Sequence, residues 1–229
     1  MEHNLTARIN GVFLGKIEQR WEGRAPSAIR KTAVAQSCEI DENGFVEDKQ
    51  ADLEVHGGPD KAIHHYAADH YADWIREGEI PDGTVPAAFG ENISTLGMTE
   101  DTMCVGDILR LGTAIVQVSQ GRQPCWKVSE HTQNPQMAYL FQKTGRTGWY
   151  YRVLENGMVG VGDDIHLLER PQPGWSIRRV TTARLSRSIS NEGAAILAHM
   201  PELANGWRTA FAKLASGNTD EDTSKRLNG

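Results

Sequence analysis

Short hydrophobic stretches separated by turn residues fill the first two-thirds of the chain and predict β-strands. The clearest are Ala7–Gly15, Ile108–Leu111 followed by Ala114–Ser119, and Met158–Val161 followed by Ile165–Leu168. Gly112-Thr113 and Gly162-Asp163-Asp164 supply the turns that would join the last two pairs into hairpins. Many short strands at close spacing are typical of a β-barrel or a β-sandwich.

Helical spacing of apolar residues interrupts the strand pattern at two places. In Ala67–Glu77, the side chains of Ala67, Tyr71 and Trp74 fall on one face of a predicted helix. A second helix is predicted near Pro135–Gln142. The chain is therefore expected to be mainly β, with peripheral helices.

The character of the sequence changes after Arg170. The stiff, polar connector 171–174 (PQPG) is typical of a domain boundary. Beyond it we expect three helices, at Val180–Arg187, at Asn191–His199 with Ser190 as N-cap, and at Leu203–Ala215. We therefore expect a barrel domain over 1–171, a small three-helix domain over 174–218, and a charged, disordered tail over 219–229.

Composition and charge narrow the classes of function that fit. Hydrophobic residues make up 39% of the 229 positions, charged residues 24%, and the formal net charge is -6. This charge argues against binding to a nucleic-acid polymer or an anionic membrane, because phosphate groups need a basic face. We find no signal-peptide core and no apolar run of about 20 residues. Three widely spaced cysteines disfavour a disulfide framework, so the cytoplasm is the expected compartment.

The densest cluster of unusual residues is the stretch 55–66 (VHGGPDKAIHHY). Its Gly-Gly-Pro turn offers free backbone amides beside ionisable side chains, as a site for a bound anion would. A tight turn with surface histidines is the alternative. A zinc site formed by the histidines at 56, 64, 65 and 70 is disfavoured, because His65 and His70 would lie about 140° apart around a helix.

A second cluster, 116–127 (VQVSQGRQPCWK), ends a predicted strand with a cysteine in a polar loop. Arg122 and Lys127 are cations close to Cys125 in sequence, and nearby cations favour the thiolate, which is both a nucleophile and a ligand for soft metals. The alternative for a single cysteine is a small buried hydrophobic residue. We expect that alternative for Cys38 and Cys104, whose neighbours are less polar.

Taken together, several segments resemble the MOSC family, and in particular its YiiM-type bacterial members. The segments are PSAIRK at 26–31, VHGGPDKAIHHY at 55–66, AFGENIS at 88–94, VGDILRLG at 105–112, VQVSQGRQPCWK at 116–127 and TGRTGWYYRVLENG at 144–157. The resemblance implies a MOSC-type β-barrel, and the helical region beyond residue 174 looks like the three-helix domain that follows the barrel in YiiM-type proteins.

The resemblance also implies a molybdenum cofactor (molybdopterin) whose metal is bound by Cys125. Reductive members of the family convert N-hydroxylated purines, bases and amidoxime-like compounds to amines, and take electrons from a separate flavin-containing reductase. We expect His65 or His56 to supply a proton, with Cys125 and His65 as the catalytic pair. The cofactor-binding residues expected are Ser27, Lys31, His56, Gly57, Gly58, Asp60, Glu91, Asn92, Ser119, Gln120 and Arg122.

Several alternatives remain open at this point. Asp60 is either a cofactor contact or a brace for its loop through Lys61 or backbone amides. The protein as a whole is either the reductase, a non-catalytic cofactor carrier or sulfur-handling module, or a cysteine hydrolase that pairs Cys125 with a histidine. The sequence also leaves a homodimer open.

Overall fold

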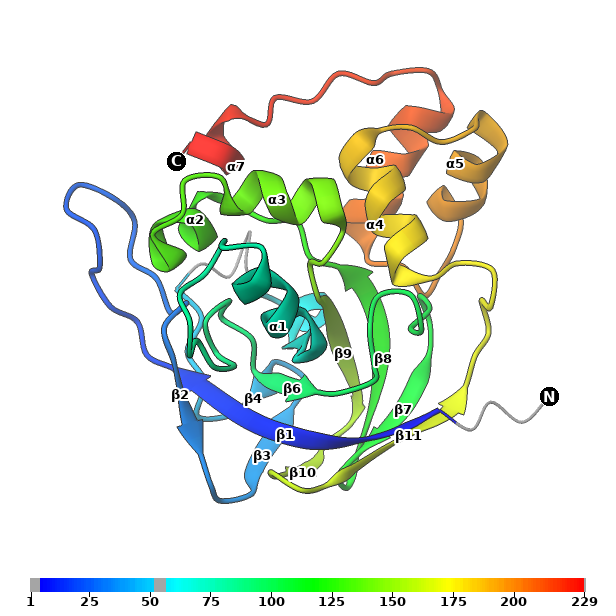
Figure 1. Ribbon diagram of the computed structural model, residues 1–229. Coiled ribbons are helices and arrows are strands. Elements are labelled where there is room, and N and C mark those ends of the chain that lie inside the picture. The colour runs from blue at the N-terminus through cyan, green and yellow to red at the C-terminus, as the bar shows by residue number, and fades with distance from the viewer. Residues whose placement is uncertain (1–4, 52–56, 229) are drawn as a thin grey trace.

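The computed structural model describes residues 5–51 and 57–228, and its centre is a closed β-barrel (Figure 1). In the described part of the chain seven strands close the barrel in the order β11-β7-β8-β9-β5-β6-β1, because β1 pairs with β11. Their bounds are β1 Thr6–Gly15, β5 Ile63–Ala67, β6 Ile93–Thr95, β7 Ile108–Leu111, β8 Ala114–Gly121, β9 Trp149–Glu155 and β11 Asp164–Glu169. The predicted mainly-β barrel with peripheral helices is confirmed.

Only some of the predicted strand pairings are correct. The hairpin of β7 and β8 forms as expected, with Leu111 opposite Ala114. The hairpin predicted across 162–164 is wrong. β10 (Gly157–Val159) pairs instead with β3 (Cys38–Asp41), which pairs with β4 (Gly44–Phe45) in a separate small sheet. The chain leaves that sheet before β11 begins, and Gly162 takes a positive φ of 92° in the connection.

Further elements cover one end of the barrel. β2 (Lys31–Val34) extends the sheet from β1, and the helices α1 (Asp69–Arg76), α2 (Trp126–Thr132) and α3 (Met137–Thr144) lie near its end (Figure 1). Ala67 belongs to β5 and not to the predicted helix, which begins two residues later.

A second hydrophobic cluster holds these helices together. Trp74 is fully buried and donates a hydrogen bond from Nε1 to the Tyr66 hydroxyl at 2.7 Å. The Phe141 ring stacks on both Tyr66 and Trp74, with ring centroids 5.7 Å apart in each pair. Aromatic packing of this kind buries large apolar surfaces and fixes the helices against the strands below.

The C-terminal helices are α4 (Ile177–Ser186), α5 (Asn191–Ala198) and α6 (Asn205–Ala215). Ser190 is the N-cap of α5, as predicted, because its hydroxyl accepts a hydrogen bond from the Gly193 amide at 3.1 Å. Val180 and Phe211 belong to the same buried cluster as the barrel residue Val118. The core therefore continues from the barrel into these helices, and the division into domains at 171–174 stays a prediction.

Residues 219–228 belong to the tail for which the sequence predicts disorder, and that prediction stays untested. They run from α6 across the molecule and end in a short helix, α7 (Ser224–Asn228), beside α2 (Figure 1). Their ion pairs with other parts of the chain, described below, explain why a segment poor in apolar residues packs against the molecule.

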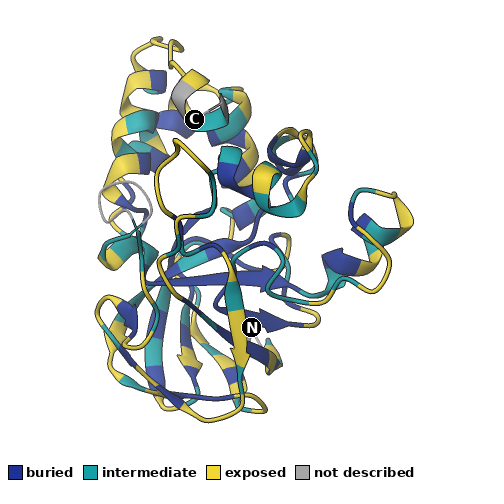
Figure 2. Cartoon of the chain, turned by 90° about the vertical axis from the view of Figure 1, so that its left-hand side faces the viewer, coloured by how far each residue is buried: buried dark blue, intermediate teal, exposed yellow. Residues whose placement is uncertain are grey.

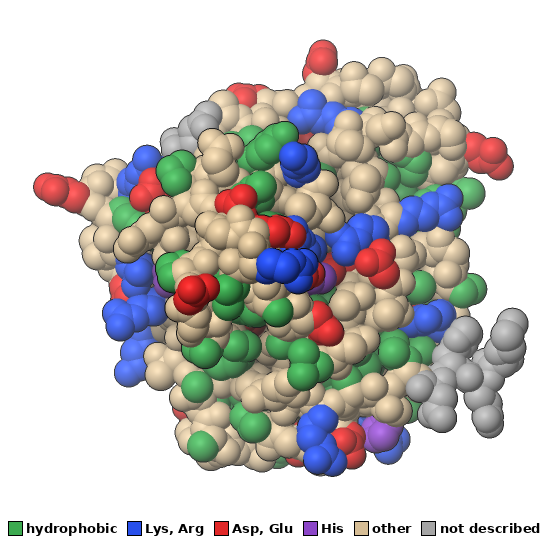
Figure 3. Space-filling view, viewed as in Figure 1, with side chains coloured by type: hydrophobic (Ala, Val, Ile, Leu, Met, Phe, Trp, Pro, Cys, Tyr) green, Lys and Arg blue, Asp and Glu red, His purple; other side chains and the backbone are tan. Residues whose placement is uncertain are grey.

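The surface is mixed in character. Buried residues line the barrel strands and the inner sides of the helices, while exposed residues lie on the outside (Figure 2). On the face of Figure 3, Lys and Arg side chains lie close to Asp and Glu side chains. Among the helices that the structure describes, none has the length and apolar character that a membrane span requires.

Candidate functional site

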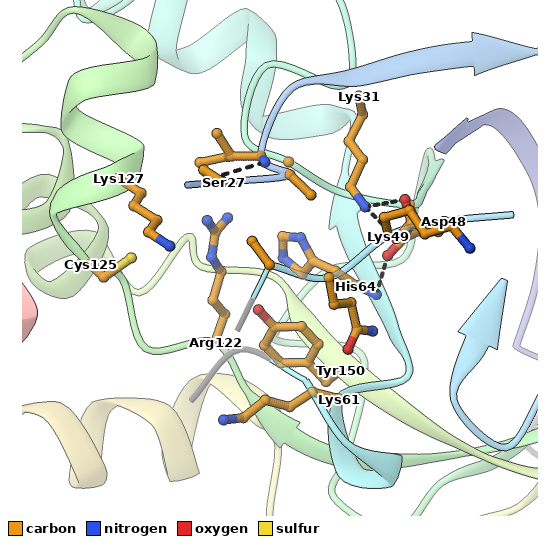
Figure 4. A pocket seen from close by; sticks show the side chains of 16 residues that line it. Ser27, Lys31, Asp48, Lys49, Lys61, His64, Arg122, Cys125, Lys127 and Tyr150 are labelled. Atoms are coloured by element: carbon orange, nitrogen blue, oxygen red, sulfur yellow. Dashed lines mark hydrogen bonds and ion pairs between the residues drawn. The ribbon is translucent and has the colours of Figure 1, made fainter. Parts of the chain in front are cut away.

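A cleft at the helix-covered end of the barrel gathers residues from distant parts of the sequence (Figure 4). Its space measures about 630 Å³ when the part that opens to solvent is counted. Its walls come from 27–31, 48–51, Lys61, β5, the loop at 90–92, and the segment 122–127, which includes Cys125. Tyr150 of β9 also lines it.

Cys125 stands where the chain leaves β8 and turns into α2. It occupies the N-cap position of α2 with an extended backbone, φ -132° and ψ 171°, and only 7% of the residue is exposed. Figure 4 shows its sulfur directed toward the amino group of Lys127 and the guanidinium of Arg122. The two cations predicted from sequence to lie near this thiol are therefore beside it in the structure.

Backbone carbonyl groups hold both of these cations in place. Arg122 donates from Nη1 to the carbonyl of Phe89 at 2.6 Å, and Lys127 donates from Nζ to the carbonyl of Pro26 at 3.3 Å. Each of the two residues is only 7% exposed. Because these partners are neutral, the positive charges remain available to attract an anion or a thiolate.

Lys31 carries a different balance of charge, because Asp48 neutralises it. Its Nζ lies 2.7 Å from Oδ1 and 2.5 Å from Oδ2 of Asp48. The same carboxylate accepts hydrogen bonds from the Gly15 amide and from Asn92 Nδ2. Burial lowers the pKa of Lys31, and the charge of Asp48 opposes that shift. The pair braces the cleft wall and contributes little net charge to it.

His64 lies between Arg122 and Lys31 in the cleft (Figure 4). It is 4% exposed, and its Nε2 is buried with no hydrogen-bond partner among the described residues. Burial, and next the charge of Arg122, hold the pKa of His64 well below its usual 6.5, so the ring is neutral. The Tyr150 ring packs beside it with centroids 5.0 Å apart. Nε2 lies near Gly148, where an added Cβ would come within 2.8 Å of it, and it keeps an unused hydrogen-bonding capacity beside the cleft.

His65, expected as a proton donor, does not reach the cleft. It is fully buried on the barrel-core side, where Nδ1 meets the Tyr151 hydroxyl and Nε2 meets Thr95 Oγ1, each at 2.9 Å. Burial lowers its pKa to about 3. Successive residues of a strand point to opposite faces, so only one of two neighbouring histidines can face the cleft. His65 therefore does not line the cleft, and His64 is the histidine of β5 that does.

Comparison with known proteins identifies the family to which this chain belongs. The family model of the MOSC domain matches residues 52–166. Protein YiiM of Escherichia coli (strain K12) is 38% identical over 232 residues, which cover 95% of this chain and 97% of that protein. The chain is a YiiM-type member of the MOSC family.

Further comparisons agree in fold and sequence. The crystal structure of YiiM from Geobacillus stearothermophilus superposes with a TM-score of 0.78 and 33% identity, covering 91% of this chain and 99% of that one. A protein of Gibberella moniliformis named "Reductase" is 41% identical over 137 residues, which span 59% of this chain and 24% of the fungal protein. This chain thus matches about a quarter of that longer protein.

Five of the residues predicted for the MOSC site line the cleft, namely Ser27, Lys31, Asn92, Arg122 and Cys125. Gly57, Gly58, Asp60, Glu91, Ser119 and Gln120 do not line it. His56 lies outside the described residues.

Three of the remaining predicted residues do not line the cleft but form contacts with neighbouring segments. Asp60 pairs with Arg152 at 2.7 Å, a partner other than the Lys61 or backbone amides expected for a brace. Ser119 donates to the Asp60 carbonyl at 2.6 Å. The Glu91 carboxylate accepts hydrogen bonds from the Ala87 and Phe89 amides, and so shapes the loop whose carbonyl binds Arg122.

The cleft residues that sequence reasoning did not predict as site residues include Asp48, Lys61, His64 and Tyr150. Asp48 lies in a polar stretch with no local signal, and its role arises only from contact with Lys31. His64 was noted among the histidines, but choosing it over His65 requires the register of β5. Among the described residues, no group of three or more His, Cys, Asp or Glu side chains is arranged to hold a metal ion.

Proposed function

We propose that this protein is a molybdenum-cofactor-dependent reductase that converts N-hydroxylated bases and related compounds to amines, with Cys125 as the protein ligand of the metal. The observation that carries the proposal is the Cys125 thiol beside Arg122 and Lys127 in the cleft of a MOSC barrel. MOSC domains are generally associated with molybdenum cofactor binding.

The residues of the cleft fit such a cofactor. Molybdenum held by a pterin dithiolene is a soft centre, which a single protein thiolate completes well. The cofactor carries phosphate, and the charges of Arg122 and Lys127 suit an anion. Ser27 and Tyr150 line the same cleft and carry hydroxyl groups of the kind that a polar pterin ring or a substrate can bind.

The cleft residues have different roles in the proposed reaction. When bound, the metal centre supplies the two-electron chemistry that breaks the N–O bond. Each N–OH group needs two electrons and two protons to become an N–H group and water. The neutral ring of His64 offers a hydrogen bond that orients the reacting group, and water entering the open cleft supplies the two protons. Arg122 and Lys127 keep Cys125 in its thiolate form.

We assign the supply of electrons to a separate flavin-containing reductase. The name of the fungal relative, of which this chain matches about a quarter, is in keeping with a role in reduction. A thiolate in a cationic cleft also suits a second candidate, a cofactor carrier or sulfur-handling module, because a persulfide on Cys125 would meet the same cations.

A turnover experiment separates these candidates. The purified protein, isolated from cells that make the cofactor, is incubated anaerobically with an N-hydroxylated purine and a reduced viologen dye, and the amine product is measured. We expect turnover by the wild type, none by Cys125→Ser, and near-normal turnover by the control Cys104→Ala. A cofactor-loaded wild type that forms no amine would favour the carrier.

A further inference from the structure

The C-terminal segment returns from the helical region to the loop that carries Cys125. It crosses from α6 over α3 and ends in α7 against α2 (Figure 1). Leu227 packs against the hydrophobic cluster that includes Ile29 and Val128. Ile29 lines the cleft and Val128 lies in the first turn of α2, so α7 rests on elements that form the site.

One end of this segment is fixed by an ion pair. The Glu221 carboxylate accepts two hydrogen bonds from Arg184, Nη1 at 2.7 Å and Nη2 at 2.8 Å, and the Arg184 side chain is only 9% exposed. Arg187 donates to the backbone carbonyls of Thr219 and Glu221, each at 3.1 Å. Bidentate pairing of a largely buried guanidinium fixes direction as well as distance.

The other end is fixed at the residue before the cysteine. Arg226 donates from Nη1 to the carbonyl of Pro124 at 2.5 Å, and from Nη2 to Gln142 Oε1 of α3 at 2.9 Å. The Pro124 carbonyl belongs to the peptide plane that leads into Cys125. A hydrogen bond that holds this plane also holds the direction in which the Cys125 side chain leaves the backbone.

We propose that residues 219–228 form a clamp over the candidate site, and that Arg226 is a positioning residue that holds Cys125 through the carbonyl of Pro124. The Glu221 ion pair keeps the clamp closed from a distance. The consequence for cofactor binding rests on the function proposed above, whereas the clamp itself rests on the contacts of Glu221 and Arg226.

Hydrogen exchange of the full-length protein tests the clamp directly. Glu221→Gln and Arg226→Gln are compared with the wild type and with Asp220→Asn, a control that removes a neighbouring exposed carboxylate of the same segment. We expect exchange in peptides covering 122–130 to be about fivefold faster in the first two variants, the effect of losing roughly one net hydrogen bond. Peptides from the barrel strands should be unchanged, and Asp220→Asn should match the wild type.

Retention of molybdenum during dialysis tests the positioning role. We expect loss of the metal to be about fivefold faster in Arg226→Gln and Glu221→Gln, with partial rescue in Arg226→Lys, which keeps a charge and a donor. Unchanged exchange at 122–130 would overturn the clamp. Faster exchange with unaltered metal retention would overturn the positioning role. A wild type that binds no molybdenum would count against the proposed function, while the exchange result still decides the clamp.

Discussion

His64 and His65 are neighbours in β5, yet their side chains lie on opposite sides of the barrel wall. The His65 ring packs against Trp149 with centroids 4.3 Å apart, inside the core, while the His64 ring packs against Tyr150 at 5.0 Å, in the cleft. One strand thus supplies a structural histidine and a site histidine at consecutive positions, because strand side chains alternate. The two residues should respond differently to substitution.

Replacing His65 should damage stability. His65→Ala removes two buried hydrogen bonds and leaves a cavity, so we expect a loss of about 3 kcal/mol in the free energy of unfolding. His64→Ala, whose ring faces the cleft, should cost about 1 kcal/mol and reduce turnover of N-hydroxylated substrates at least about tenfold. Urea unfolding and steady-state kinetics measure both effects. Equal loss of turnover per folded molecule in the two variants would contradict the assignment of His64.

Acid should destabilise the fold through its buried histidines. The folded-state pKa of His65 is about 3, compared with 6.5 in the unfolded chain, so between these pH values the unfolded state binds the extra proton. The stabilisation is complete above pH 6.5 and falls by about 1.4 kcal/mol per pH unit as the pH drops toward 3. His131, with a pKa of about 4, and His64 act in the same direction.

The variant His65→Gln should make this pH dependence shallower by about one proton. Urea midpoints at pH 7, 6 and 5 give the slope for wild type and variant. If His65→Gln retains the full wild-type slope, His65 is not neutral in the folded protein.

The Lys31–Asp48 pair should behave as a buried ion pair. Asp48→Ala leaves the Lys31 ammonium and two further donors without their acceptor, so we expect a loss of about 3 kcal/mol in the free energy of unfolding. The double variant Lys31→Met, Asp48→Leu should be less destabilised than Asp48→Ala, because no charge remains buried. Denaturant unfolding measures the difference. An Asp48→Ala protein as stable as the wild type would contradict the pairing.

Features of the fold could be predicted from the sequence where the interacting residues are close together along the chain. The β7–β8 hairpin and the Ser190 cap are local, and both were predicted correctly. The partner of β10 is β3, more than 100 positions earlier in the chain, and no local pattern reports such pairing. The pattern of short strands predicted a barrel or a sandwich, because turn residues mark where strands end, and the resemblance to the MOSC family implied the barrel.

In the candidate site, too, contacts between residues close in sequence were predictable, and contacts between distant residues were not. Cys125, Arg122 and Lys127 are close in sequence, so their meeting was predictable from spacing alone. Asp48 meets Lys31 and Asn92 only in the folded chain, and its polar sequence neighbourhood resembles any surface loop. The choice between His64 and His65 depends on a register shift of one residue, which hydrophobic patterning cannot resolve where both faces of a strand are buried.

Arg122 should contribute to holding the cofactor. Arg122→Gln removes a buried positive charge beside Cys125, so we expect molybdenum to be lost about tenfold faster on dialysis. Arg110→Gln, which removes an exposed arginine of β7, is the control and should retain metal like the wild type. Metal content after timed dialysis gives both rates. Equal rates for the two variants would show that the charge of Arg122 does not serve the cofactor.

The most direct test of the central claim is the molybdenum and pterin content of freshly purified protein from cells that make the cofactor. The account predicts about one molybdenum and one pterin per chain in the wild type and in Cys104→Ala, since one thiolate completes the metal site. It predicts that Cys125→Ser contains much less molybdenum than the wild type and forms no stable complex with the cofactor. Equal molybdenum in Cys125→Ser and the wild type, or none in the wild type after anaerobic incubation with cofactor, would contradict it.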